Sequence, residues 1–294
     1  ARAFIHSFFF GVLTARPENL LTIKLCFPIL LMEKRINMDV DHDPVARIPL
    51  NTDICTNNNQ CKKGDPECCE LCLYEFELEL PHLPDMVFPK NKLILTHKNG
   101  ARIEFNPLDA LRRVQNGKSS IQVACANEWK DSRPDSNLLE EVKPFDWSFS
   151  TDYQGTFNEK IRLEPTDTKL DIFKLMQKER LLFFHEISLF EDELHDHGIS
   201  MCSAKIRVMP SGFYILLTYF LRVDNVVIRM NGTRFHFEKD KDYILKEFTS
   251  REAKFENIKH IPPAVYTVPA EIEKHLNVTV KTTEKLFFNP ANET

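Results

Sequence analysis

Acidic residues and histidines crowd one short segment of the chain, residues 190–198, which reads FEDELHDHG. If this segment is extended, His195 and His197 lie on one face, and the carboxylates beside them offer the kind of ligand set that binds a metal ion. A helix would instead separate the two histidines by about 200° around its axis. Contiguous acidic clusters are also common at turns, and Gly198 has the character of a helix C-cap. Two interpretations therefore stand: a metal-dependent hydrolase built on the two histidines, and a structural turn, which we favour.

Other signatures of catalysis or cofactor binding are missing from the sequence. It has no HExxH metal motif, no GxSxG nucleophile elbow, and neither the GxGxxG nor the GxxxxGK[ST] pattern of phosphate-binding loops. Cys125 and Cys202 lie in apolar, strand-like surroundings, where a cysteine usually behaves as a small hydrophobic residue. We therefore expect no catalytic residue, no metal and no cofactor.

Composition limits the possible partners. The net charge is -5 and the pI is near 6.1, and lysines and arginines are scattered rather than clustered. Such a surface offers no basic face to a phosphate backbone, so we expect no nucleic acid. The 43% hydrophobic content of the 294 residues is ordinary for a soluble globular protein of one large or two modest domains.

The N-terminal region differs from the remainder of the chain. Residues 4–31 are rich in Phe, Leu and Ile, and Arg2 with the largely apolar residues 3–15 after it loosely resembles a secretory signal. Charged residues and prolines interrupt them, so no stretch reaches the roughly 20 apolar residues that span a membrane. We expect residues 1–70 to be an atypical extension, disordered or incorrectly joined to the domain that follows, and we expect no membrane partner.

A cysteine-rich stretch lies within and just after this extension. Its members are Cys55, Cys61, Cys68, Cys69 and Cys72. Cys69 and Cys72 have the spacing of zinc ligands, but a structural zinc site needs a second pair as well spaced. Zinc and disulfides both remain alternatives, and an incidental cluster is the default.

The strongest strand signals form hairpins. Residues 213–221 form an apolar run, and residues 222–230 are largely Val and Ile but include Asp224 and Asn225 near their start, which predicts a buried antiparallel hairpin that turns at these two residues. Residues 92–96 and 101–105 predict another around Asn99 and Gly100. We also expect strands at residues 121–126 and 285–288. In residues 143–156 aromatic and polar residues alternate, which suits either a half-buried edge strand or an exposed aromatic platform.

Helix signals occur at four places. Asn106 as N-cap, Pro107, Asp109 and a closing Gly117 predict a short helix in which Asp109 complements the N-terminus. Residues 168–186 combine a capping box with apolar residues at helical spacing, which predicts a helix packed across the sheet. Residues 249–252 form a further capping box ahead of a helix stopped by a Pro-Pro pair, and residues 269–275 predict another helix.

Three glycosylation sequons begin at Asn231, Asn277 and Asn292. They would be used only in a secreted protein. Together with the cysteines, they keep a secreted protein as a third, weaker possibility.

Several long sequence words together resemble one known family. They are DWSFSTDYQGT, LFEDELHDHGIS, KIRVMPSGFYILL, FLRVDNVVIRMN, EFTSREAK and HIPPAVYTVPAEI, and their order and spacing are similar to the TIPRL family of TOR-signalling regulators. The likeness covers residues 78–288. It implies a single α+β domain of antiparallel sheets with flanking helices over residues 71–290, followed by a polar tail at residues 291–294. The family's opening strand, which carries a tryptophan, has no counterpart in residues 1–70.

The resemblance also implies a function. Family members are cytoplasmic, non-enzymatic proteins that bind catalytic subunits of type 2A protein phosphatases, restrain their activity as inhibitors and take part in their biogenesis. The family's contact positions correspond here to Asp109, Leu170, Met230 and Gly232, and a cleft is thought to receive the phosphatase's C-terminal tail. Family members commonly carry Asp in place of Gly232 and Ile in place of Leu170. From the residues alone, Asp109 also suits helix capping, and Met230 also suits core packing at a strand end.

Overall fold

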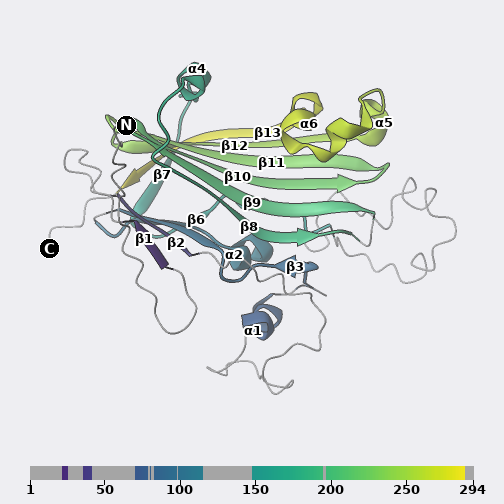
Figure 1. Cartoon of the computed structure of the whole chain (residues 1–294), viewed down its shortest axis with the longest axis horizontal. Coiled ribbons are helices and arrows are strands. Elements are labelled where there is room, and N and C mark those ends of the chain that lie inside the picture. The colour runs from purple at the N-terminus through teal and green to yellow at the C-terminus, as the bar shows by residue number, and fades with distance from the viewer. Residues whose placement is uncertain are drawn as a thin grey trace, which may run out of the picture.

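The computed structural model describes residues 22–25, 36–41, 70–78, 80, 83–97, 99–114, 148–194 and 197–288 (Figure 1). Its large sheet has the strand order β3-β8-β9-β10-β11-β12-β13-β7, and its small sheet the order β1-β2-β4-β5-β6. All the strand pairs are antiparallel. Figure 1 shows the small sheet below the large one, with α4, α5 and α6 above it.

The strands of the large sheet are mostly long. They are β3 (Met86–Val87), β7 (Ile161–Pro165), β8 (Phe183–Asp192), β9 (Gly198–Met209), β10 (Gly212–Val223), β11 (Val227–Glu238), β12 (Tyr243–Lys254) and β13 (Asn277–Phe288). The small sheet consists of β1 (Thr22–Leu25), β2 (Ile36–Asp41), β4 (Lys92–His97), β5 (Arg102–Phe105) and β6 (Thr156–Phe157).

The helices are few and short among the described residues. They are α1 (Glu70–Glu77), α2 (Pro107–Arg112), α4 (Ile172–Met176), α5 (Phe255–Ile258) and α6 (Pro269–Ile272), with 3-10 turns η3 (Pro263–Thr267) and η4 (Glu273–His275). None of the helices in the described part is long and apolar enough to cross a membrane. The strand pairing confirms the antiparallel sheets expected from the sequence. The described part of the domain is richer in strands than in helices.

The central hairpin is confirmed as β10 and β11, which pair from Gly212 with Glu238 to Val223 with Val227. Asn225 has a φ of 62° in the connecting loop, a conformation that asparagine tolerates better than most residues. The second strand runs on beyond its predicted end at Met230, so Asn231 and Gly232 lie within β11.

The predicted β4–β5 hairpin and the helix after it are also confirmed. Asn106 caps α2 by accepting a hydrogen bond from the backbone N–H of Asp109, at 2.8 Å. The helix ends at Arg112 instead of continuing towards Gly117. The short helix predicted at residues 269–275 appears as α6 and η4, and residues 285–288 form the end of β13.

The main hydrophobic core fills the space between the two sheets. Phe105 of β5 meets Phe235 of β11 edge-on, with ring centroids 5.4 Å apart, and both side chains are fully buried. Phe149 and Tyr153 also belong to this core, so an exposed aromatic platform is wrong for these two residues. Apolar burial of this kind is the main favourable term that holds the sheets together.

A second hydrophobic cluster lies on the opposite face of the large sheet. There Phe220 and Met230 pack beneath α5, η3 and α6, against Ile258, Tyr266 and Ile272. We call the face of the large sheet that points away from the small sheet the outer face. The second cluster covers one end of the outer face, and α4 lies over the other (Figure 1).

The long helix predicted at residues 168–186 is wrong. Only Ile172–Met176 are helical, with Asp171 as N-cap, and Phe183 already belongs to β8. Two of the apolar side chains expected to face the core are exposed, Ile172 at 50% and Met176 at 75%. Residues 166–182 instead form a strap that joins β7 to β8 over the outer face.

Two smaller predictions are also wrong. The capping box at residues 249–252 lies inside β12, and the short helix α5 begins only at Phe255. Gly198 is the first residue of β9 and not a helix C-cap. A Cβ at Gly198 would come within 2.0 Å of the carbonyl oxygen of Arg222, so close strand pairing requires glycine there.

Several expectations fall outside the described residues. These are the strand at residues 121–126, the aromatic residues Phe145 and Trp147, the cysteines from Cys55 to Cys69, the sequon at Asn292 and the tail at 291–294. Within residues 1–70, the structure describes β1, β2 and the first residue of α1. Strand β2 pairs with β4 and so extends the small sheet.

Candidate protein-binding surface

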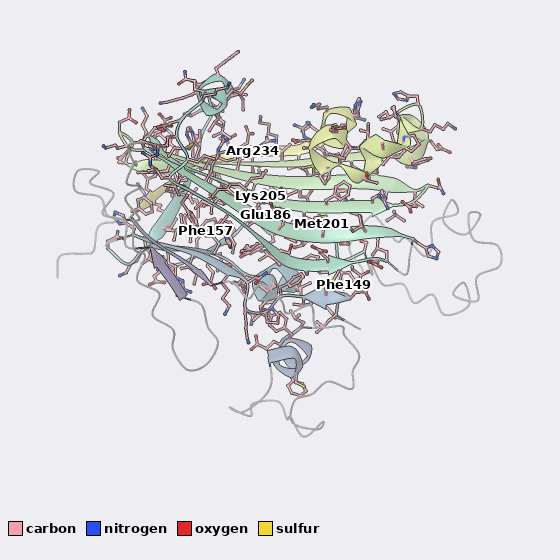
Figure 2. All side chains as sticks on the ribbon, viewed as in Figure 1. Phe149, Phe157, Glu186, Met201, Lys205 and Arg234 are labelled. Carbon is pink, nitrogen blue, oxygen red and sulfur yellow. The ribbon has the colours of Figure 1, made fainter. Side chains whose placement is uncertain are left out.

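The outer face of the large sheet is open between its two covered ends. Figure 2 shows Glu186, Lys205 and Arg234 there, with Met201 nearer the second cluster. Lys205 and Glu186 form an ion pair of 2.8 Å across β8 and β9, and each is about half exposed. A Cβ placed on Gly232 would have no other atom within 4 Å. This part of the sheet is therefore accessible to a large partner.

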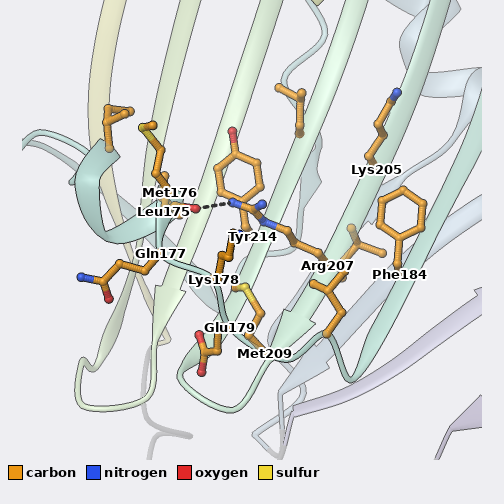
Figure 3. Close-up of a pocket in the computed structure, with 14 residues that line it drawn as sticks. Leu175, Met176, Gln177, Lys178, Glu179, Phe184, Lys205, Arg207, Met209 and Tyr214 are labelled. Carbon is orange, nitrogen blue, oxygen red and sulfur yellow. Dashed lines mark hydrogen bonds between the residues drawn. The ribbon is translucent and has the colours of Figure 1, made fainter.

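The strap encloses a pocket of about 690 Å³ against strands β8–β10 (Figure 3). We call it the strap pocket. Its apolar lining includes Leu175, Met176, Phe184, Met209, Tyr214 and Leu216, and its charged lining consists of Lys178, Glu179, Lys205 and Arg207. Apolar walls with a few polar groups are typical of ligand and peptide sites.

Arg207 is the central polar group of the strap pocket. Its guanidinium lies 4.9 Å from the ring centroid of Tyr214, and one of its terminal nitrogens donates to the carbonyl oxygen of Leu175, at 3.1 Å. Its Nε is buried and has no hydrogen-bond partner among the described residues. Arginine recognises carboxylates through paired N–H groups, so Arg207 is suited to bind an anionic group in this pocket.

An ion pair and two hydrogen bonds hold α4 and the strap in place. Lys174 of α4 pairs with Glu238 of β11. Glu179 accepts hydrogen bonds from the backbone N–H and the hydroxyl of Ser211, at 2.9 and 2.5 Å. The shape of the strap pocket therefore depends on contacts made by residues far apart in the sequence.

A cluster of linked ion pairs lies between the open part of the outer face and α6. Arg234 binds Glu247 at 3.2 Å and Glu273 at 2.7 Å, Arg251 lies 3.3 Å from Glu273, and Lys281 lies 2.8 Å from Glu247. We call these five residues the charged cluster. It has three cations and two carboxylates, so one positive charge is left over.

Asp109 lies on the side of the small sheet. Its carboxylate accepts hydrogen bonds from Thr156 at 2.6 Å, from Asn106 at 2.8 Å and from Arg112 at 3.0 Å. Burial opposes ionisation of this group, but the hydrogen bonds outweigh it and hold the pKa of Asp109 below its usual value. The capping role predicted from the sequence therefore has a clear basis in the structure.

We expect Asp109→Asn to lower the free energy of unfolding at pH 7 by about 1–2 kcal/mol, because charge-assisted hydrogen bonds are lost. The folded pKa lies below the unfolded one, so the carboxylate's contribution is present above the unfolded value and is lost as the pH falls through the folded value. Urea unfolding of the wild-type chain and of Asp109→Asn between pH 7 and pH 2 measures how the difference in free energy of unfolding changes with pH. Asp152→Asn, which affects only an exposed pair with Arg113, is the control; equal losses in both variants would contradict the prediction.

The four contact positions implied by the resemblance do not form one patch. Met230 and Gly232 direct their side-chain positions to the outer face, whereas Asn231 between them reaches the opposite face and donates to the carbonyl oxygen of Thr151. The hydroxyl of Thr151 in turn binds α2, the helix that carries Asp109. Asp109 is therefore separated from the other two positions by the large sheet.

The accessibility of these positions also differs. Gly232 is open, and the Asp109 side chain is 23% exposed. Met230 is buried in the second cluster, and Leu170, in the strap before α4, is buried as well. A contact role for the last two requires that a partner reach them through their neighbours.

The acidic segment at residues 190–198 includes a structural turn. Asp192 is buried and accepts hydrogen bonds from the backbone N–H groups of Asp85 at 2.9 Å and of Leu194 at 2.7 Å. His195 lies outside the described residues. Within the described ranges, no three His, Cys, Asp or Glu side chains lie close enough to hold a metal ion. No observation therefore favours the hydrolase alternative.

Two further predictions concern single buried residues. Cys202 is buried in β9, and burial raises the pKa of its thiol, so it behaves as the expected small hydrophobic residue. Asn231 is buried with its amide nitrogen bonded to Thr151, which makes it a poor glycosylation acceptor.

The sequence reasoning missed the strap pocket and the charged cluster. A signal existed, because Lys205 and Arg207 alternate with apolar residues in β9, and so do Arg234 and His236 in β11. Period-two alternation marks one face of a sheet as polar. The sequence of the strap did not indicate a pocket, because its apolar residues are spaced as in a helix.

Comparison with known proteins identifies relatives over most of this domain. Residues 86–259 match the model of the TIP41-like family. A rat TIP41-like protein is 50% identical over 216 residues, which cover 72% of this chain and 80% of the relative. The human TIP41-like protein is 48% identical over 226 residues, 74% of this chain and 83% of the relative. A Saccharomyces cerevisiae protein named type 2A phosphatase activator TIP41 is 36% identical over 240 residues, 73% of this chain and 67% of the relative.

Proposed function

The chain belongs to the TIP41-like family, and from this premise we propose that it regulates type 2A protein phosphatases by binding their catalytic subunits, without catalysing a reaction itself. The observation that carries the proposal is the combination of family membership with the names of the yeast relatives, both type 2A phosphatase activators. The fission yeast relative is 33% identical over 183 residues. A role in TOR signalling and a cytoplasmic location belong to the same proposal.

The outer face is the surface that we assign to the catalytic subunit. Two features support this choice: its middle is open at Gly232, and ionic side chains border it in the charged cluster and in the pair of Lys205 with Glu186. Charged and polar groups around an accessible surface give specificity and fast association in protein complexes. In this arrangement Gly232 makes a direct contact, Met230 and Leu170 support the surface from beneath, and Asp109 acts chiefly on stability.

The strap pocket is our candidate for the phosphatase's C-terminal tail. Leu175, Phe184 and Tyr214 provide apolar walls for side chains of a short peptide. Arg207, whose Nε has no hydrogen-bond partner in the described part of the chain, is placed to bind the terminal carboxylate. The end of a peptide chain needs both kinds of contact. The arginine positions the terminal carboxylate, and the apolar walls supply most of the affinity.

Binding and activity assays test this function. Purified chain should capture a type 2A catalytic subunit at micromolar concentration, and it should lower the activity of the isolated subunit. Absence of capture would refute the proposal, and increased activity of the isolated subunit would show activation in place of the inhibition that the resemblance implies.

We expect Gly232→Asp to strengthen capture of the catalytic subunit by about three- to tenfold, because it restores the carboxylate common in the family at an open position. Titration by biolayer interferometry measures the change. Gly232→Asn is the matched control, since it adds the same volume without the charge. An equal gain in both variants would mean that the added volume, and not the carboxylate, makes the contact.

A further inference from the structure

Part of strand β13 has no neighbour on one side among the described residues. Strand β7 pairs with β13 only from Glu284 to Phe288. After Pro165 the chain makes one more contact, from the N–H of Thr166 to the carbonyl oxygen of Thr283, and then leaves for the strap. On the other side, β12 pairs with β13 along its whole length, with one irregularity near Ser250. We call residues 277–282 of β13 the free edge.

The backbone of the free edge is oriented for pairing with another strand. In an antiparallel sheet, the N–H and C=O groups of successive residues point alternately to the two neighbouring strands. The carbonyl oxygen of Thr283 points towards β7, so alternation directs the backbone groups of Lys281 to the same, unpaired side. An exposed strand edge of this kind is a template for an additional strand.

Exposed valines lie on both faces of the free edge, because the irregularity at Ser250 and Arg251 sets Val280 on the face of the small sheet and Val278 on the outer face. Val278 and Val280 are 48% and 47% exposed. Val280 and Thr282 also line a pocket of about 380 Å³ that continues over Phe248 of β12 to Asp152 and Gln154. Exposed β-branched residues on an edge strand favour pairing with another β-branched strand, because cross-strand neighbours pack closely.

On the outer face the free edge carries one cation, Lys281. The side chain of Lys281 points to the outer face and is half exposed, and it belongs to the charged cluster, which has one positive charge left over. Between Asn277 and Thr283 the strand has no acidic residue. An added strand would therefore place the side chain that it sets opposite Lys281 near this positive charge.

We propose that the free edge binds an extended segment of a partner protein, in which apolar β-branched residues alternate with acidic ones. The segment joins the large sheet as an additional strand beside β13. On the face of the small sheet its apolar side chains pack on Val280 and Thr282, and on the outer face an acidic side chain approaches Lys281. Main-chain hydrogen bonds supply affinity and the alternating side chains supply specificity, as in other cases of strand addition. This site lies beyond the strap pocket, and it does not depend on the identity of the phosphatase partner.

The probe is a fluorescein-labelled peptide of alternating valine and glutamate, titrated into the full chain and followed by fluorescence anisotropy. Hydrogen exchange of the complex measures where it binds. We expect saturable binding and slower exchange of the backbone amides in residues 277–283, Lys281 included. Binding that is absent at millimolar peptide, or that protects other residues instead, would overturn the proposal.

Two matched comparisons complete the test. We expect Val280→Glu to weaken binding by about tenfold or more, because it removes the apolar contact and repels the acidic peptide. Val268→Glu, at a comparably exposed valine outside the edge, should leave binding unchanged. A peptide with lysine in place of glutamate should bind more weakly than the probe. Equal binding of the two peptides, or of the two variants, would overturn the proposal, as would sedimentation showing that the free edge pairs with a second copy of this chain.

Discussion

Met230→Lys is expected to lower the free energy of unfolding by at least about 3 kcal/mol, because it removes apolar packing and puts an ammonium group into a buried cluster. Met230 is 6% exposed and packs with Phe220 and Ile258 beneath the helices. Urea denaturation followed by circular dichroism measures the loss. Any loss of phosphatase capture in this variant would therefore first report unfolding around α5 and α6, and not a lost contact.

Met230→Leu separates the two roles of this residue. Leucine keeps the apolar volume, so we expect a stability loss below about 1.5 kcal/mol. If Met230 only supports the outer face, capture of the catalytic subunit should be unchanged in this variant. A folded Met230→Leu protein with at least tenfold weaker capture would instead show that the methionine side chain itself touches the partner.

Sequence reasoning succeeded where the local signal and the final structure agree. The loop at Asp224 and Asn225 lies between two long apolar runs, and both runs became strands of the same hairpin. At Asn106 the cap, the proline after it and the acidic residue of the first turn all favour the same helix start. In these cases the preference of the neighbouring residues and the tertiary contacts favour the same element.

The failures occurred where tertiary contacts outweigh local spacing. The apolar residues of 168–186 recur at helical intervals, but strand β9 offers an unpaired edge to Phe183 and the residues after it, and β8 pairs with it. Only Ile172–Met176 stay helical. Likewise Thr249 and Glu252 resemble a capping box, yet β11 and β13 lie on either side of them and keep them in β12. Propensity is a weak predictor against such pairing.

The candidate surface was harder to predict than the fold. The strap pocket is assembled from the strap, β8, β9 and β10, and no short motif contains more than a part of it. The resemblance supplied four positions, but the large sheet separates Asp109 from Gly232, which a one-dimensional pattern does not reveal. The alternation of charged residues in β9 and β11 shows which face is polar, and only the folded chain shows that α4 closes one end of it.

Arg207→Gln should weaken binding of a peptide with the C-terminal residues of a type 2A catalytic subunit by about 10- to 100-fold, because a charged hydrogen bond contributes roughly 1.5–3 kcal/mol. Glutamine keeps one donor and most of the apolar stem but loses the positive charge. Fluorescence anisotropy with a labelled peptide measures the effect. Circular dichroism of the variant checks that the strap, which Arg207 also holds through Leu175, stays folded.

The same peptide with an amidated C-terminus identifies the group that Arg207 binds. If the guanidinium recognises the terminal carboxylate, amidation weakens binding to the wild-type chain and has little effect on Arg207→Gln, because the two changes remove the same interaction. Lys178→Gln, at another cation lining the strap pocket, is the matched control and should retain the preference for the free carboxylate. Additive losses from amidation and Arg207→Gln would place the peptide's end elsewhere in the pocket and leave Arg207 as a support for the strap.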